Sequence, residues 1–207
     1  MNLPGARIAL GICGASGMIY AEALVSMLAR SGAELSVCAS RAAKPVFGSE
    51  TGTAFESFAA SVSARHPNAR FYADDDFSAP IASGSYMFDA MAVCPCSMKT
   101  LGLIANGIAQ NLICRAADVA LKERRRLVLV PRETPLALSH LRNMCAVAEA
   151  GGVVLPACPA FYGGEKTVSD IANFIAARTV SAMGFKQDSL AEWGQAKKTE
   201  EPNEKGL

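Results

Sequence analysis

The sequence predicts an α/β protein with a doubly wound parallel sheet. Short apolar segments alternate along the chain with segments of helical periodicity, and no internal repeat is visible. Turns rich in glycine and small polar residues follow some of the apolar segments. Strands that alternate with helices pair in parallel and carry the helices on their faces. At 207 residues the chain is long enough for one well-buried core.

Five short apolar segments are predicted as strands, because charged or turn-forming residues bound each of them. In chain order they are Arg7–Gly11, Glu34–Ala39, Met91–Cys94, Arg126–Val130 and Val153–Leu155. The segment Arg126–Val130 ends at Pro131, which bounds the strand.

Helical spacing of apolar residues predicts helices between and after these strands. They are Met18–Arg30, Ala42–Phe47, Thr100–Ile108, Ala117–Glu123, Leu136–Glu149 and Thr167–Met183. The glycine pair 151–152 is a typical helix stop after Glu149. Residues 56–90 show no clear pattern and contain a turn-like segment at 72–76.

Composition limits the classes of function. A formal net charge of +1 gives no overall field that would favour nucleic acid or an acidic membrane surface. Apolar residues make up 51% of the chain, but charged residues interrupt every stretch of the roughly 20 residues that a membrane helix needs. The N-terminus lacks a secretory signal pattern. We expect residues 1–185 to form a single domain and residues 186–207 a charged segment, partly disordered beyond Trp193.

The seven cysteines carry no metal-binding pattern. No CxxC pair occurs, and Cys94-x-Cys96 stands without a second pair of ligands. We therefore predict that most of them are reduced core thiols of a cytoplasmic protein. His66 and His140, the two histidines, have no nucleophile or metal-ligand spacing nearby, which argues against a triad or a zinc site.

Two polar turns after predicted strands indicate a phosphate-bearing ligand. Residues 11–17 read Gly-Ile-Cys-Gly-Ala-Ser-Gly, and their GxxGxxG spacing differs from the GxGxxG dinucleotide fingerprint. Residues 95–100 read Pro-Cys-Ser-Met-Lys-Thr. Backbone N–H groups, hydroxyls and a lysine at a helix start bind phosphate, but the same residues also serve as a tight turn and a helix cap. Both interpretations stay open for each turn taken alone.

Two further segments also follow predicted strands. Arg132 and Glu133 form either a surface ion pair or a site in which Glu133 acts as an acid beside bound phosphate. Residues 156–164 hold Phe161 and Tyr162 in a loop bounded by prolines and glycines, as a buried plug or as a wall over a ring ligand. The basic run 122–126 is typical of a solvated helix end.

In combination and in order, over about residues 7–193, these segments resemble the UbiX/Pad-type flavin prenyltransferases. The blocks that carry the resemblance are Gly14–Gly17, Pro95–Thr100, Arg115–Val119, Leu121–Arg125, Pro131–Leu136, His140-Leu141, Asn143-Met144 and Pro159–Tyr162.

The resemblance implies a flavodoxin-like (Rossmann-like) three-layer sandwich with a parallel sheet, assembled as a dodecamer with active sites between subunits. It implies that a dimethylallyl group passes from dimethylallyl phosphate to reduced FMN, first at flavin N5 and then at C6. The product, prenylated FMN, serves UbiD-type decarboxylases. No metal is implied, in agreement with the missing zinc spacing and the missing Asp-rich diphosphate motif.

The resemblance also implies roles for individual residues. The expected FMN-binding residues are Gly14, Ala15, Ser16, Ser40, Ser97, Met98, Lys99, Thr100 and Arg132. The expected residues around the allyl phosphate are Glu50, Arg115, Lys122, Tyr162 and Arg178. Ser16 would assist proton movement near N5, Glu133 would protonate the leaving phosphate, and Trp193 would face the allylic cation with its indole ring.

The sequence departs from the family pattern in two places. Residues 163–166 read Gly-Gly-Glu-Lys where many relatives have a His-x-Pro-type continuation, and Cys13 stands where Thr or Ser is usual.

Two other functions are considered. One alternative is an FMN-dependent cysteine decarboxylase of the phosphopantothenoylcysteine decarboxylase type, against which Lys99 argues. The other is a non-catalytic FMN-carrying accessory subunit, which would need none of Glu133, Tyr162 and Arg178.

Overall fold

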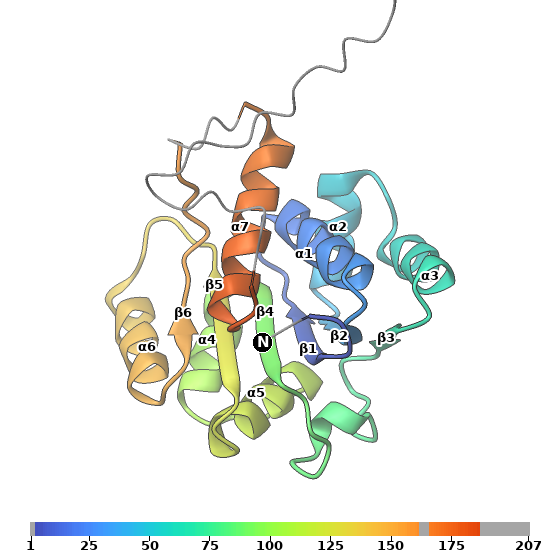
Figure 1. Ribbon diagram of the computed structural model, residues 1–207. Helices are drawn as coiled ribbons and strands as arrows, with labels where there is room; N and C mark the ends of the chain where they lie inside the picture. The colour runs from blue at the N-terminus through green and yellow to red at the C-terminus, as the bar shows by residue number, and fades with distance from the viewer. Residues whose placement is uncertain (1–2, 162–165, 187–207) are drawn as a thin grey trace, which may run out of the picture.

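The computed structural model describes residues 3–161 and 166–186, and Figure 1 shows how their helices and strands are arranged. Within these residues, six parallel strands form one sheet in the order β3-β2-β1-β4-β5-β6. The strands are β1 (Arg7–Ile12), β2 (Glu34–Ala39), β3 (Ala69–Tyr72), β4 (Ala90–Cys96), β5 (Arg126–Pro131) and β6 (Val153–Val154). The predicted doubly wound parallel sheet is confirmed.

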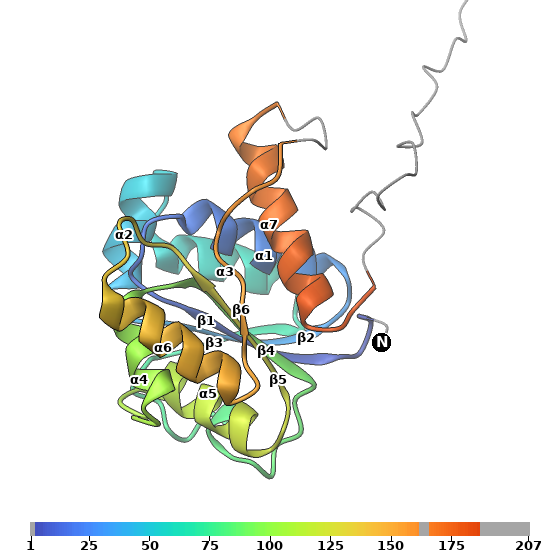
Figure 2. The same ribbon diagram turned by 90° about the vertical axis from the view of Figure 1, so that its left-hand side faces the viewer.

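Helices cover both faces of the sheet, so the protein has three layers (Figure 2). One face carries α1 (Met18–Arg30), α2 (Ala43–Thr51), α3 (Phe55–Arg65) and α7 (Val168–Ala182). The other face carries α4 (Met98–Ala105), α5 (Leu112–Lys122) and α6 (Leu138–Glu149).

Each face of the sheet is buried in its own apolar core. Ile8, Leu10 and Ile12 of β1 pack in the core shared with α1 and α7. Ala9, between them, belongs to the core shared with α4 and α5. A strand covered on both faces needs apolar residues at every position, which is why these segments read as continuous apolar runs.

The part of the sequence without a clear pattern contains three elements that were not predicted. They are α3, β3 and the short 3-10 helix η1 (Pro80–Ala82). Helix α3 buries Phe55, Phe58 and Val62, whose spacing is helical. Strand β3 is an edge strand of four residues, of which only Ala69 is buried, so its pattern is weak.

Two helices begin earlier than their apolar spacing predicts, because a polar side chain caps each of them. Ser97 caps α4, which starts at Met98, and Asn111 caps α5, which starts at Leu112. Both caps place a helix N-terminus at the carboxyl edge of the sheet, directly after β4 in the case of α4.

The direction of winding reverses next to β1. The chain proceeds from β1 outward to β2 and β3, and then returns to place β4, β5 and β6 on the other side. In open parallel sheets, ligands bind outside the carboxyl ends of the strands at such a switch point. A ligand-binding site is therefore expected at the carboxyl ends of β1 and β4.

Candidate active site at the carboxyl edge of the sheet

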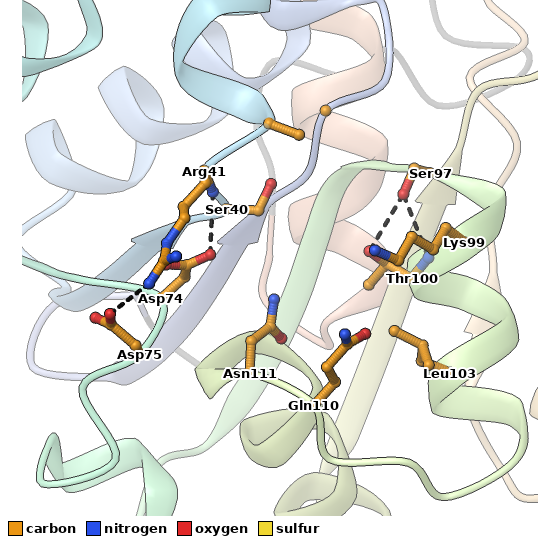
Figure 3. A pocket seen from close by; sticks show the side chains of 12 residues that line it. Ser40, Arg41, Asp74, Asp75, Ser97, Lys99, Thr100, Leu103, Gln110 and Asn111 are labelled. Atoms are coloured by element: carbon orange, nitrogen blue, oxygen red, sulfur yellow. Dashed lines mark hydrogen bonds and ion pairs between the residues drawn. The ribbon is translucent and has the colours of Figure 1, made fainter.

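A cavity of about 530 Å³ lies at this switch point, and Figure 3 shows the side chains around it. The residues that line it are Gly14, Ser40, Arg41, Ala42, Asp74, Asp75, Ser97, Lys99, Thr100, Leu103, Gln110 and Asn111. They come from the segments after β1, β2, β3 and β4, from helix α4 and from the segment before α5. Five of the predicted cofactor-binding residues therefore meet here: Gly14, Ser40, Ser97, Lys99 and Thr100.

The N-terminus of α4 forms one wall of the cavity. The Ser97 Oγ accepts a hydrogen bond from the Thr100 N–H at 3.3 Å and donates one to the Thr100 Oγ1 at 3.2 Å. Lys99 is exposed beside them, whereas the predicted ligand Met98 is buried in the apolar core. Free backbone N–H groups, two hydroxyls and a lysine at a helix start give a binding place for a phosphate.

Close packing of two turns closes the cavity from the side of β1. A Cβ atom added at Gly14 would lie 2.7 Å from the Ala42 Cβ and 2.9 Å from the Ala42 carbonyl oxygen. Only glycine allows this approach. Ser40, at the end of β2, is held by its N–H, which donates to the Ile12 carbonyl at 2.9 Å.

The far wall consists of residues that sequence reasoning missed. Arg41, Asp74 and Asp75 form an ion-paired group there, and Gln110 and Asn111 lie between this group and α4 (Figure 3). The aspartates were interpreted only as turn formers, because the strand that places them, β3, was not recognised. Had β3 been recognised, its carboxyl end would have indicated these residues.

A second group of predicted residues meets at the N-terminus of α1. The Glu50 carboxylate accepts hydrogen bonds from the N–H groups of Gly17 at 2.9 Å and Met18 at 2.8 Å. Burial raises the pKa of Glu50, but the hydrogen bonds from Met18, the Ser16 hydroxyl and Gly17 outweigh it, so the pKa lies below its ordinary value. An ionised Glu50 thus holds the turn that carries Ser16.

Arg132 and Glu133 lie at the end of β5, next to this turn. The Arg132 N–H donates to the Cys96 carbonyl at 3.4 Å, and its Cγ would lie 4.0 Å from a Cβ at Gly17. The Glu133 Oε1 accepts a hydrogen bond from the Thr134 N–H at 3.1 Å. In the described part of the chain, neither Arg132 nor Lys99 forms an ion pair, so both cations remain available for a bound anion.

Three predicted substrate-binding residues lie away from the cavity within one chain. The Arg115 side chain donates to the Ala82 carbonyl at 2.9 Å and to Asp118 at 2.8 Å. Lys122, at the far end of α5, pairs with Glu123 at 3.3 Å. The last residue of α7, Ala182, accepts a hydrogen bond at its carbonyl from Arg126, which starts β5 at the amino edge of the sheet. Arg178 is one helical turn before Ala182, so Arg178 also lies toward the amino edge. Tyr162 and Trp193 lie outside the described residues, as does the glycine pair 163–164.

The cysteines do not form a reactive group at this edge. All seven are free thiols, and Cys13, Cys38, Cys94, Cys96 and Cys114 are buried. Burial raises the pKa of Cys94 and Cys38, and it raises that of Cys114 to about 11. A hydrogen bond with the Cys96 thiol lowers the pKa of Cys13. The five buried thiols pack in the two apolar cores, as predicted, whereas Cys145 and Cys158 are exposed and are not core residues.

The described residues contain no helix that has both the length and the apolar character needed to span a bilayer.

Comparisons with known proteins identify the family. The family model described as Flavoprotein matches residues 1–180. The flavin prenyltransferase UbiX of Methanocaldococcus jannaschii is 42% identical over 188 residues, which cover 91% of this chain and 98% of the relative. The UbiX of Pseudomonas aeruginosa is also 42% identical, over 91% of this chain and 94% of the relative.

Solved structures show the same relationship. A dodecameric FMN-dependent UbiX-like decarboxylase from Escherichia coli O157:H7 has a TM-score of 0.81 at 38% identity, over 90% of this chain and 99% of that one. AnUbiX (PadA1), in complex with FMN and dimethylallyl pyrophosphate, has a TM-score of 0.81 at 37% identity, over 91% and 100%. The cysteine decarboxylase TvaF, at 18% identity and a TM-score of 0.56, shares the fold alone. The chain therefore belongs to the Flavoprotein family and, within it, to the flavin prenyltransferases of the UbiX type.

Proposed function

We propose that this protein transfers a dimethylallyl group from dimethylallyl phosphate to reduced FMN, forming bonds at N5 and C6 and releasing phosphate. The main observation behind the proposal is that two clusters of residues lie next to each other at the carboxyl edge of the sheet. The N-terminus of α4 offers a phosphate-binding wall, and Ser16, Glu50 and Arg132 gather at the β1–α1 turn, with Glu133 next to Arg132 in the chain. A relative 37% identical was solved with FMN and dimethylallyl pyrophosphate, which supports this pairing of ligands.

The residues present fit the phosphate end of FMN. Ser97, Thr100 and Ser40 supply hydroxyls, and Lys99 supplies a positive charge that no described carboxylate pairs with. The close approach at Gly14 brings backbone to the cavity wall, where Ala15 and Ser16 continue toward α1. Reduced FMN supplies the nucleophilic ring atoms N5 and C6 when it is bound.

The residues beyond the turn would act on the allyl phosphate. As the C–O bond to phosphate breaks, the phosphate leaves with the electron pair, and Glu133 gives it a proton. Arg132, which forms no ion pair with the described residues, would compensate the charge of the leaving group. Ser16, hydrogen-bonded to the ionised Glu50, moves a proton near N5. Trp193 would present its ring to the allylic cation.

Neighbouring subunits would complete the site. Arg115, Lys122 and Arg178 lie away from the cavity in their own chain, and a 38%-identical relative is dodecameric. We therefore assign these residues, together with Tyr162, to the site of an adjacent subunit in a dodecamer.

The described residues disfavour the alternative of a cysteine decarboxylase. That chemistry relies on a catalytic histidine, and His66 follows α3 three residues before β3 begins. His66 thus lies at the amino edge of the sheet, opposite the cavity. His140 is in α6, where its Nδ1 accepts a hydrogen bond from the Ala137 N–H at 3.2 Å.

The product would serve a UbiD-type decarboxylase, and the free state of all seven thiols supports a reducing compartment, the cytoplasm.

Mass spectrometry of the flavin tests the reaction. Anaerobic incubation with reduced FMN and dimethylallyl phosphate should add one C5H8 unit to the flavin. An unchanged flavin would overturn the proposal and favour a non-catalytic flavin carrier. Glu133→Gln should slow turnover about 100-fold while FMN stays bound, since general acid catalysis contributes about 10²–10⁴-fold. Glu149→Gln, at the exposed end of α6, is the matched control and should match the parent.

Co-expression of two inactive variants tests the shared site. Arg132→Ala and Lys122→Ala should each be inactive alone, but random mixing should restore about a quarter of the sites if the two residues act from different subunits. If mixing restored nothing, the assignment of Lys122 to a neighbouring site would be wrong.

A further inference from the structure

The ion-paired group at the far wall of the cavity joins the ends of two adjacent strands. Arg41 follows β2 by two residues, and Asp74 and Asp75 follow β3, which pairs with β2. The Arg41 Nε lies 3.4 Å from the Asp74 Oδ1, and its Nη2 lies 2.6 Å from the Asp75 Oδ2. All three residues line the cavity (Figure 3).

The two carboxylates hold Arg41 in different ways. Asp74 has a side chain only 15% exposed, and it accepts a hydrogen bond from the Arg41 backbone N–H at 3.0 Å as well as facing Nε. The Asp74 carbonyl is itself fixed by the Leu112 N–H at 2.8 Å. Asp75 is 64% exposed and contacts only the outer nitrogen, Nη2. Asp74 is therefore a fixed support, and Asp75 is a surface partner that is easily displaced.

Carboxylates on the wall of a phosphate-binding cavity repel the phosphate unless a nearby cation neutralises them. The opposite wall carries Lys99 and the N-terminus of α4. Arg41 is 78% exposed, and a free arginine of that exposure would sample many rotamers. Asp74 faces the Nε edge of the guanidinium, and Asp75 occupies one of the two outer nitrogens.

We propose that Arg41 is a ligand of the FMN phosphate, that Asp74 positions it, and that Asp75 competes with the phosphate for the outer guanidinium nitrogen. The inference rests on the proposed function, because it takes FMN as the flavin. It predicts opposite effects for two substitutions that remove the same charge from neighbouring positions. Loss of the Asp74 charge weakens binding because Arg41 loses its support, and loss of the Asp75 charge strengthens binding because a competitor disappears.

The dissociation constants of FMN and riboflavin, measured by quenching of flavin fluorescence, test this assignment. Riboflavin lacks the phosphate and so isolates its contribution. Arg41→Ala should weaken FMN binding about tenfold, the value of one charge-assisted hydrogen bond at an exposed site. Asp74→Asn should weaken FMN binding about threefold and Asp75→Asn should strengthen it about twofold, as expected of exposed ion pairs. None of the three variants should change the affinity for riboflavin.

Asp76→Asn is the matched control. It removes the same charge one position further along, where the carboxylate accepts hydrogen bonds from Ser78 and does not line the cavity. Its FMN affinity should equal that of the parent. Thermal melting of each variant confirms that the fold persists.

Three results would overturn the assignment. If Asp74→Asn and Asp75→Asn both strengthened binding, the carboxylates would act only as repulsive charges. If Arg41→Ala left the FMN affinity unchanged, Arg41 would not be a ligand of the phosphate. If Arg41→Ala weakened FMN and riboflavin binding equally, the substitution would act on the shape of the cavity wall and not on the phosphate. Prenylation by the parent at saturating FMN reports separately on the proposed function, so the two failures are distinguishable.

Discussion

Substitution of Gly14 by alanine tests whether the approach of two turns forms the flavin cavity. The added Cβ would lie 2.7 Å from the Ala42 Cβ and 2.9 Å from the Ala42 carbonyl carbon and oxygen. The nearest of these contacts must open by about 0.7 Å to reach an ordinary van der Waals distance. Because Ala42 is fixed backbone rather than the end of a flexible side chain, the whole turn that carries Ser40 must move.

Overpacking of this kind costs about 1–3 kcal/mol. In a protein of this length each kcal/mol lowers the melting temperature by about 2–4 °C, so Gly14→Ala should melt about 2–12 °C below the parent. FMN affinity should fall at least about tenfold, because the cavity wall is displaced relative to α4. Differential scanning calorimetry and a fluorescence titration with FMN measure the two effects.

Gly48→Ala is the matched control for this substitution. Gly48 lies within α2, and the nearest atom to an added Cβ is the Thr53 carbonyl oxygen at 3.9 Å. Alanine there should stabilise the protein by about 0.5–1 kcal/mol and leave FMN affinity unchanged. The reasoning about the cavity is refuted if Gly14→Ala binds FMN as tightly as the parent and melts at the same temperature.

Two further predictions concern helix termini. Ser97→Ala and Thr167→Ala each remove a capping side chain and should each cost about 1 kcal/mol in chemical denaturation, but only Ser97→Ala should weaken FMN binding; equal FMN affinities would remove Ser97 from the phosphate site. Because the pKa of Glu50 is lowered in the folded protein, its ionised form stabilises the fold above the ordinary value of 4.5, and this stabilisation is lost as the pH falls through the lowered pKa. Glu50→Gln should therefore melt below the parent at pH 7, and the difference should disappear at acidic pH; a difference independent of pH would contradict this role.

The central strands were predictable because burial on both faces imposes an unbroken apolar run. The segments at 34–39 and 126–130 match β2 and β5 to within a residue. Edge strand β3 could not be recognised, since only Ala69 of its four residues is buried and the sequence therefore shows no apolar run. Its strand conformation depends on backbone pairing with β2, which the sequence does not show. The aspartates that follow it were missed as cavity residues for the same reason.

Sequence reasoning found individual site residues where a turn carries them directly after a strand. Ser97, Lys99 and Thr100 are of this kind, and the structure brings them to one wall. The contact between Glu50 and the start of α1 spans more than thirty residues, and nothing in the local sequence announces it. The distance of Lys122 from the cavity of its own chain was equally invisible, because a linear motif does not show which subunit uses it.

The carboxylate at the start of α1 has a consequence for how this enzyme can change. In many nucleotide-binding folds the first helix after β1 offers its positive end to the phosphate. Here the Glu50 carboxylate already accepts the hydrogen bonds of that end, so we expect the cofactor phosphate to bind at the N-terminus of α4 instead. Anchoring and chemistry then depend on different helices. In the proposed function, substitutions at Ser97 or Lys99 would change how tightly the flavin phosphate is held, and substitutions at Glu50 or Glu133 would change how fast the allyl group is transferred. Retention and rate can therefore be varied independently, by evolution or by design.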